Sequence, residues 1–202
     1  MNREFEKIIR ARRSIRKFRP DPVPEKKILE LIELASWAPS AGNRQDWFFS
    51  ITRSPELIRK MADVVKDKWQ KIISDNSSSG IIGDIADYSS NFSRFAEASV
   101  IIAVSAPAPA SFEKQMLGDK AGATFGSFTS AAMAAQNLML AAELHGLGTF
   151  CLTGPIAAES ELKELLDIKR RHELVCLIAL GYPDEEPKAP PRKNIESITR
   201  FL

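Results

Sequence analysis

Two polar clusters near the start of the chain carry the side chains best suited to hold a ligand. The first is RRSIRKF at residues 12–18, and the second is PSAGNRQDW at residues 39–47. Guanidinium groups can bind a phosphate through paired hydrogen bonds. Amide groups, which donate and accept at once, suit the edge of a polar heterocycle. Together the clusters suggest a phosphorylated ring cofactor.

Each cluster also allows a purely structural interpretation. Six basic residues lie between Arg10 and Arg19 with no acidic residue among them, which is also the composition of a solvated basic turn. The segment around Asn43 fits an Asx-type turn between a helix and a strand. The residues alone leave these alternatives open.

The elements that must position the clusters follow from the apolar pattern. Apolar residues at helical spacing predict a short amphipathic helix over 4–12, which delivers the chain to the basic cluster. A second helix is predicted over 24–37, with Pro24 at its first position, and Pro39 helps to end it. Residues 40–46 then form a loop that leads into an aromatic and β-branched strand over 47–52.

The middle of the chain predicts two long buried elements. Ser54-Pro55 should cap a helix that follows the first strand. Residues 74–91 show little periodicity and are expected to form a mobile loop, and residues 98–105 form a strand buried on both faces. The Ala- and Met-rich stretch at 119–145 is expected to be the longest helix, central in the fold, with the polar Gln136 and Asn137 satisfying buried backbone groups.

The last third predicts two strands, a helix and an extended arm. A short strand over 149–152 follows glycines that end the central helix, Gly154-Pro155 leads into a helix, and a buried strand covers 174–180. The proline-rich segment 183–191 must run extended. The tail at 194–202 is too apolar to be left in water, so a partner subunit is expected to bury it.

Composition bounds the class of protein. The chain has 202 residues, 44% of them hydrophobic, which suits one domain, and a formal charge of +2, which argues against nucleic acid or an anionic membrane as the main partner. Cys151 and Cys176 fit neither a disulfide framework nor metal-ligand spacing, so we expect buried, inert thiols, no metal, and a soluble, cytoplasmic protein. The longest apolar runs are too short to span a membrane.

Four motifs, taken in order, resemble the nitroreductase family. They are the RRSIRKF cluster, APSAGNRQDWFF at 38–49, AAMAAQNLMLAA followed by GLGT at 131–149, and GYPDEEP before PPRK at 181–193. The resemblance implies an α+β three-layer fold, with a central, mostly antiparallel sheet flanked by helices. It also implies an intertwined homodimer that binds FMN and oxidises NAD(P)H. Residues 1–202 would form a single FMN-binding domain whose arm, about 183–202, is exchanged with the partner subunit.

The resemblance also assigns the cofactor-binding residues. The matching positions are Arg12, Arg13, Ser14 and Arg16 for the phosphate and ribityl chain; Pro39, Ser40, Asn43 and Gln45 for the ring, from the other subunit; Leu152, Thr153 and Gly154 through their backbone; and Arg192, with Lys193 as substitute, for the phosphate. A glycine at 154 would let the backbone approach a planar ligand. Family members usually have proline where this chain has Asp46, which puts the shape of the loop in question.

The implied activity is hydride transfer from NAD(P)H through flavin N5 to a nitroaromatic, a quinone or a similar small acceptor. No side chain is assigned as acid or base, because the flavin carries the chemistry. Tyr88 and Phe92 are candidates to line the acceptor pocket. Two alternatives stay open: a flavoenzyme of the same fold that performs dehydrogenation, dehalogenation or flavin fragmentation, and a non-catalytic dimer that binds or senses flavin.

Overall fold

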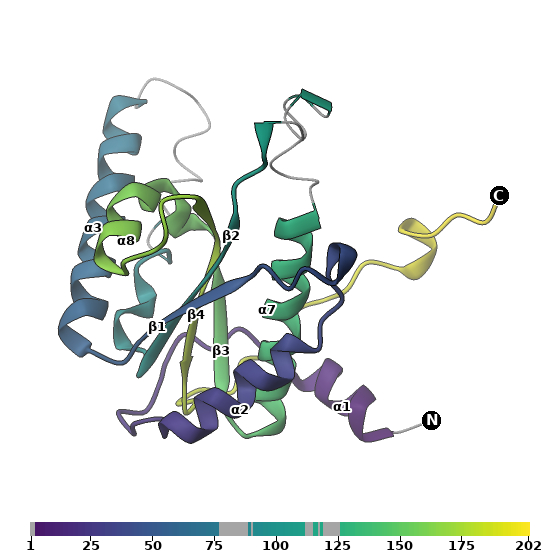
Figure 1. The fold of residues 1–202 in the computed structure, drawn as a ribbon. Helices are drawn as coiled ribbons and strands as arrows, with labels where there is room; N and C mark the ends of the chain where they lie inside the picture. The colour runs from purple at the N-terminus through teal and green to yellow at the C-terminus, as the bar shows by residue number, and fades with distance from the viewer. Residues whose placement is uncertain (1–2, 77–88, 90, 112–114, 117, 119–125) are drawn as a thin grey trace.

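A four-stranded antiparallel sheet forms the middle layer of the molecule (Figure 1). The computed structural model describes residues 3–76, 89, 91–111, 115–116, 118 and 126–202. The strands are β1 (Phe48–Thr52), β2 (Val100–Pro107), β3 (Gly148–Leu152) and β4 (His172–Gly181), and their order across the sheet is β1-β2-β4-β3. Each neighbouring pair is antiparallel. This arrangement agrees with the expected central sheet.

Helices cover both faces of the sheet. Successive side chains of a strand point to opposite faces, and the strands carry apolar residues on both. On one face α2 (Glu25–Ser36) and α7 (Gly126–Leu144) pack against residues such as Ile102 and Ile178. On the other face α3 (Pro55–Asp75) and α8 (Glu159–Leu165) pack against residues such as Ala103 and Leu177. The molecule therefore has three layers, helices on sheet on helices, as predicted.

The two central strands differ from their predicted ranges: β2 has the predicted eight residues but lies two residues later in the chain, and β4 is longer at both ends. β2 extends to Pro107 rather than ending at Ser105, because a register shift at Val104/Ser105 lets Ala106 and Pro107 continue to pair with β4. For the same reason β4 begins at His172. Every residue of β2 except Pro107 is buried, which confirms a strand covered on both faces.

Whether the Ala-rich helix is the longest stays a prediction, because only its part from Gly126 onward is described. α3 has 21 residues and α7 has 19, while positions 119–125 of the predicted helix lie outside the described residues. Ser54 accepts a hydrogen bond from the Leu57 N–H at the start of α3, apolar residues recur as far as Ile72 and Ile73, and the helix runs on to Asp75, into the expected loop. α7 is central as expected and ends where Gly146 adopts φ 69°. Gln136, however, is exposed, so its side chain does not satisfy a buried backbone group as predicted.

Two outlying segments leave apolar side chains in solvent. None of the nine residues of α1 (Arg3–Ala11) is buried, and Phe5 is 56% exposed. After β4 the chain runs without helix or strand to a short 3₁₀ turn, η5 (Ile195–Ser197), and it projects from the body past α7 (Figure 1). Ile195 is 68% exposed and Phe201 96%. The extended arm and the apolar character of the tail are therefore as predicted, and among the described residues the side chains of the tail remain largely exposed.

Candidate cofactor site

The basic segment runs beside β3, the edge strand that leads to residues 152–154. Ser14 and Thr149 form a parallel bridge, and the Ile15 N–H donates to the Thr149 carbonyl at 2.9 Å. Ile15 packs on Gly148, where an added Cβ would lie 2.7 Å from the Ile15 Cγ1. Gly148 is thus needed for the close approach of the two segments. The fold in this way brings two of the predicted groups, residues 12–14 and 152–154, to neighbouring parts of one sheet edge.

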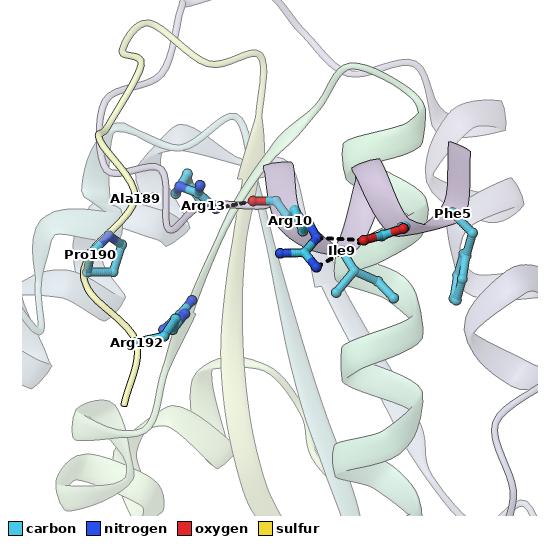
Figure 2. A pocket seen from close by; sticks show the side chains of 8 residues that line it. Phe5, Ile9, Arg10, Arg13, Ala189, Pro190 and Arg192 are labelled. Atoms are coloured by element: carbon cyan, nitrogen blue, oxygen red, sulfur yellow. Dashed lines mark hydrogen bonds and ion pairs between the residues drawn. The ribbon is translucent and has the colours of Figure 1, made fainter. Parts of the chain in front are cut away.

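A cavity of about 730 Å³ gathers guanidinium groups from opposite ends of the chain (Figure 2). Arg10 and Arg13 come from the end of α1, and Arg192 comes from the C-terminal arm. The remaining walls are mainly apolar: Phe5, Ile9, Ala189 and Pro190, with Glu6 beside them. Three cationic side chains against one carboxylate make this cavity electropositive, which suits an anionic group.

Local contacts orient the arginines of this cavity. The Arg13 Nη1 donates to the carbonyl oxygens of Arg10 and Arg12, at 2.6 and 2.8 Å. Arg10 forms an ion pair with Glu6 at 2.9 Å, one helical turn away (Figure 2). One Nη group of Arg13 is therefore used to close the end of α1, and the rest of its guanidinium fork is available to a ligand.

Arg16 does not join this cavity. Its guanidinium lies 4.5 Å from the centroid of the Phe150 ring, and its Nη1 donates to the Ser14 carbonyl at 3.2 Å. It lines a different cavity of about 630 Å³ with Ser93, Arg94 and other polar residues. The sequence motif grouped Arg16 with Arg13, but the structure separates them.

The second cluster forms a tight polar loop with unusual backbone angles. The 3₁₀ turn η1 (Ala41–Asn43) begins it, and φ is positive at Gly42 (60°), Asn43 (54°) and Gln45 (49°). The Gln45 N–H donates to Ser40 Oγ at 3.1 Å, and Gln45 Nε2 donates to Asn43 Oδ1 at 2.9 Å. Asn43 and Gln45 also line a cavity of about 410 Å³. The structure thus brings three of the predicted residues together, next to Pro39.

The two clusters lie at opposite ends of α7. The Ala41 N–H donates to Ser130 Oγ near the start of that helix, whereas Arg13 shares a cavity with Glu143 and Gly146 at its end. A helix of 19 residues is about 27 Å long. Most of the length of α7 therefore separates the two clusters of one chain.

Packing and a backbone hydrogen bond fix the position of residues 152–154. Leu152 is buried, and the Gly154 carbonyl accepts a hydrogen bond from Trp69 Nε1 at 2.9 Å. A Cβ at Gly154 would lie 2.1 Å from Phe92 Cδ1, so Phe92 itself explains the glycine. Phe92, predicted as a candidate lining residue, instead packs on Trp69, with ring centroids 4.7 Å apart. Tyr88 lies outside the described residues.

The prediction of two buried thiols was half wrong. Cys176 is buried, but Cys151 is exposed because it sits on the edge strand β3. A hydrogen bond with Cys176 lowers the pKa of the Cys151 thiol, partial burial opposes this shift, and the nearby charge of Arg12 lowers the pKa further. The same hydrogen bond, together with burial, raises the pKa of Cys176.

Two further features can be stated for the part of the chain that the structure describes. It contains no group of three or more His, Cys, Asp or Glu side chains that could hold a metal ion. None of its helices is long and apolar enough to cross a bilayer.

Comparisons with known proteins agree with these features. The sequence matches the nitroreductase family over residues 9–182. YodC of Bacillus subtilis (strain 168), named as an NAD(P)H nitroreductase, is 29% identical over 203 residues, covering 96% of this chain and 97% of YodC. An iodotyrosine deiodinase of Nematostella vectensis is 26% identical over 202 residues, covering 96% of this chain and 74% of that protein.

Solved structures show the same fold. A BluB-like flavoprotein from Clostridium difficile 630 superposes with a TM-score of 0.84 and 27% identity, covering 98% of both chains. An iodotyrosine deiodinase solved with FMN and 3-iodo-L-tyrosine has a TM-score of 0.78 at 23% identity, again over 98% of both chains. These neighbours confirm the expected α+β nitroreductase-like fold. Because the family match spans most of the sequence, the chain belongs to the nitroreductase family.

Proposed function

We propose that this protein is an FMN-dependent oxidoreductase that takes hydride from NAD(P)H and passes electrons to a nitroaromatic, a quinone or a similar small acceptor. The support comes from the family, from relatives named as NAD(P)H nitroreductases, and from the donor set of the site. We also propose a cytoplasmic location, where Cys151 and Cys176 would stay reduced.

The observation that carries the proposal is the meeting of Arg13 and Arg192 in one apolar-walled cavity. Residues almost the whole chain apart converge there, which a solvated basic turn would not require. Guanidinium forks bind phosphate bidentately, and the apolar walls limit competition from water. The donor set therefore fits the phosphate end of FMN.

The other predicted residues have complementary tasks. Arg12, Ser14 and Arg16 offer further donors along the segment beside β3, with Ser14 and Arg16 on the side opposite to Arg13, and the backbone of Leu152, Thr153 and Gly154 lies at the end of that strand. The paired amides of Asn43 and Gln45 present donors and acceptors to the polar edge of a ring. When bound, FMN supplies the hydride-carrying N5 atom. We assign no side-chain acid or base, so the protein binds and orients while water can provide the proton.

A homodimer completes the site in this proposal. One chain holds its arginine cavity and its amide loop at opposite ends of α7, so an antiparallel partner would supply the missing half of each site. Within the arm at 183–202, the part beyond Arg192 would be exchanged, burying Ile195 and Phe201 against the partner while Arg192 stays in the cavity of its own chain. Each chain would remain one domain over residues 1–202.

The test is the visible spectrum of the purified protein, with the released chromophore identified by mass, followed by anaerobic titration with NADH and NADPH. The proposal expects FMN that bleaches with one or both donors, and then steady turnover with a nitroaromatic or quinone. A protein that neither carries FMN nor takes it up would contradict the proposal.

A second candidate function is reductive dehalogenation, which the deiodinase relatives favour. Their identity to this chain, 26% over 95–96% of its length, is close to that of the nitroreductase relatives. The two candidates differ in product: the first consumes NAD(P)H steadily with a nitroaromatic, and the second releases halide from an aryl halide such as an iodophenol. Bound FMN that neither donor reduces would instead favour a flavin sensor.

A further inference from the structure

Three side chains close the turn that follows the amide loop. Asp46 Oδ2 accepts a hydrogen bond from Ser127 Oγ at 2.9 Å and pairs with Arg44 Nε at 3.2 Å. Arg44 Nη2 in turn donates to Ser127 Oγ at 2.8 Å. Ser127 is buried in the first turn of α7, and the Asp46 side chain is only 21% exposed. The three groups form a closed triangle that ties the loop to the central helix; we call it the Asp46 clamp.

The clamp brackets a residue in a rare backbone conformation. Gln45 lies between Arg44 and Asp46 and has φ 49°, in the left-handed region that residues other than glycine seldom adopt. Such conformations persist only where the surrounding structure holds them. In this conformation the Gln45 side chain turns back to donate to Asn43 Oδ1. The clamp therefore fixes the geometry of the amide pair.

A proline at position 46 would not suit the backbone of this loop. A proline disfavours helical backbone angles in the residue before it and pushes that residue towards an extended φ near −120°. That preference conflicts with the φ of Gln45. In this chain the loop is held by side-chain contacts to α7 instead of by a rigid ring.

We propose that Asp46 is a positioning residue for the flavin: through Arg44 and Ser127 it fixes Asn43 and Gln45 as one rigid amide pair that contacts the edge of the ring. The inference rests on the proposed function, because it needs a flavin at this loop. It assigns Asp46 no contact with the flavin itself.

The test measures FMN dissociation constants of the apoproteins Asp46→Ala, Ser127→Ala and the double variant, by the change in flavin fluorescence. Each single variant should bind FMN about tenfold more weakly, since small misplacement of a binding group has large effects. The double variant should be little worse than either single one, because both remove the same contact. Ser127→Ala removes one oxygen only, and it keeps the test open if Asp46→Ala does not fold.

The matched control is Asp21→Ala. Arg19 and Asp21 have the same spacing as Arg44 and Asp46 and form an ion pair at 3.7 Å, but both side chains of this pair are more than half exposed. Its loss should leave the FMN dissociation constant within twofold of the unaltered protein. Equal losses for Asp21→Ala and Asp46→Ala would overturn the inference.

A second readout separates positioning from general stability. Donors at the ring edge stabilise reduced flavin more than oxidised flavin, so the midpoint potential of bound FMN should shift to lower values in Asp46→Ala. An unchanged potential, or FMN affinity within twofold of the unaltered protein, would overturn the inference. If the unaltered protein itself binds no FMN, the proposed function fails instead.

Discussion

Arg13 lies on the cavity side of an extended segment whose other side carries Arg16. Side chains of extended backbone alternate between two sides, so residues an odd number apart face opposite ways. Ile15 shares a cavity with Arg13, while Arg16 lies over Phe150. The sequence revealed that the segment is rich in phosphate-binding groups, but not which of them face the cavity. That choice depends on pairing with Thr149, a contact distant in sequence.

Arg13→Ala is expected to weaken FMN binding roughly ten- to hundredfold, since a hydrogen bond to a charged group contributes about 1.5–3 kcal/mol. Riboflavin, which lacks the phosphate, should lose much less affinity. Fluorescence titration of both flavins gives the comparison. Arg16→Ala should have a smaller effect on FMN than Arg13→Ala, and the exposed Arg59→Ala none. Equal losses for FMN and riboflavin would show that Arg13 does not bind the phosphate.

Cys151 provides a pH-dependent prediction for the apoprotein. Its pKa is lowered chiefly by the hydrogen bond with Cys176, so its thiolate should form at lower pH than that of an unfolded cysteine. Alkylation by iodoacetamide, followed by mass spectrometry, should therefore reach its half-maximal rate at lower pH than in the urea-unfolded chain. Cys176→Ala should move this pH profile upward. A profile unchanged by Cys176→Ala would refute the role of the hydrogen bond.

At the scale of elements, the arm that carries Arg192 is joined to the basic segment before it leaves the body. Phe18 and Pro183 form an antiparallel bridge, and Glu185 Oε1 accepts the N–H groups of Arg16 and Lys17 at 2.5 and 3.2 Å. A single carboxylate oxygen thus ties the beginning of the arm to the segment that follows Ser14. This contact holds the start of the arm, from which the chain continues to Arg192.

Glu185→Ala should lower FMN affinity several-fold. Each of the two lost hydrogen bonds stabilises the docked start of the arm by about 1 kcal/mol. Glu185→Gln should retain most of the affinity, since its amide oxygen can accept the same two N–H groups. The exposed neighbour Glu186 supplies the control variant, Glu186→Ala. Isothermal titration with FMN measures all three, and a Gln variant as weak as the Ala variant would contradict the proposed contact.

Local patterns predicted the helices, strands and arm well, and they failed where distant contacts decide. The apolar stripe of α3 and the buried run of β2 are visible in the sequence, but the register shift that extends β2 to Pro107 depends on β4. Likewise, the sequence suggested Phe92 as a residue that lines a pocket, whereas its contacts with Trp69 and Gly154 depend on the fold. The sequence did not indicate the role of Asp46, because its hydrogen-bond partner Ser127 lies far along the chain.

At the scale of the whole molecule, the length of α7 divides the candidate site. Sequence motifs named both halves, yet they could not show that one chain holds them near opposite ends of a helix of 19 residues, about 27 Å long. The exposed apolar tail and the unburied face of α1 lie on the outside of the same chain. A second copy placed antiparallel would complete the divided site and would also cover the exposed apolar surface.

Mixed dimers test this account most directly. One chain would carry Arg13→Ala and the other Asn43→Ala with Gln45→Ala, each with a different affinity tag so that the mixed species can be isolated. If every site combines the arginine cavity of one chain with the amide loop of its partner, one of the two sites contains both defects and the other contains none. The account therefore predicts one FMN bound per mixed dimer with the affinity of the unaltered protein. A mixed dimer that binds no FMN at that affinity, while the unaltered dimer binds two, would contradict it.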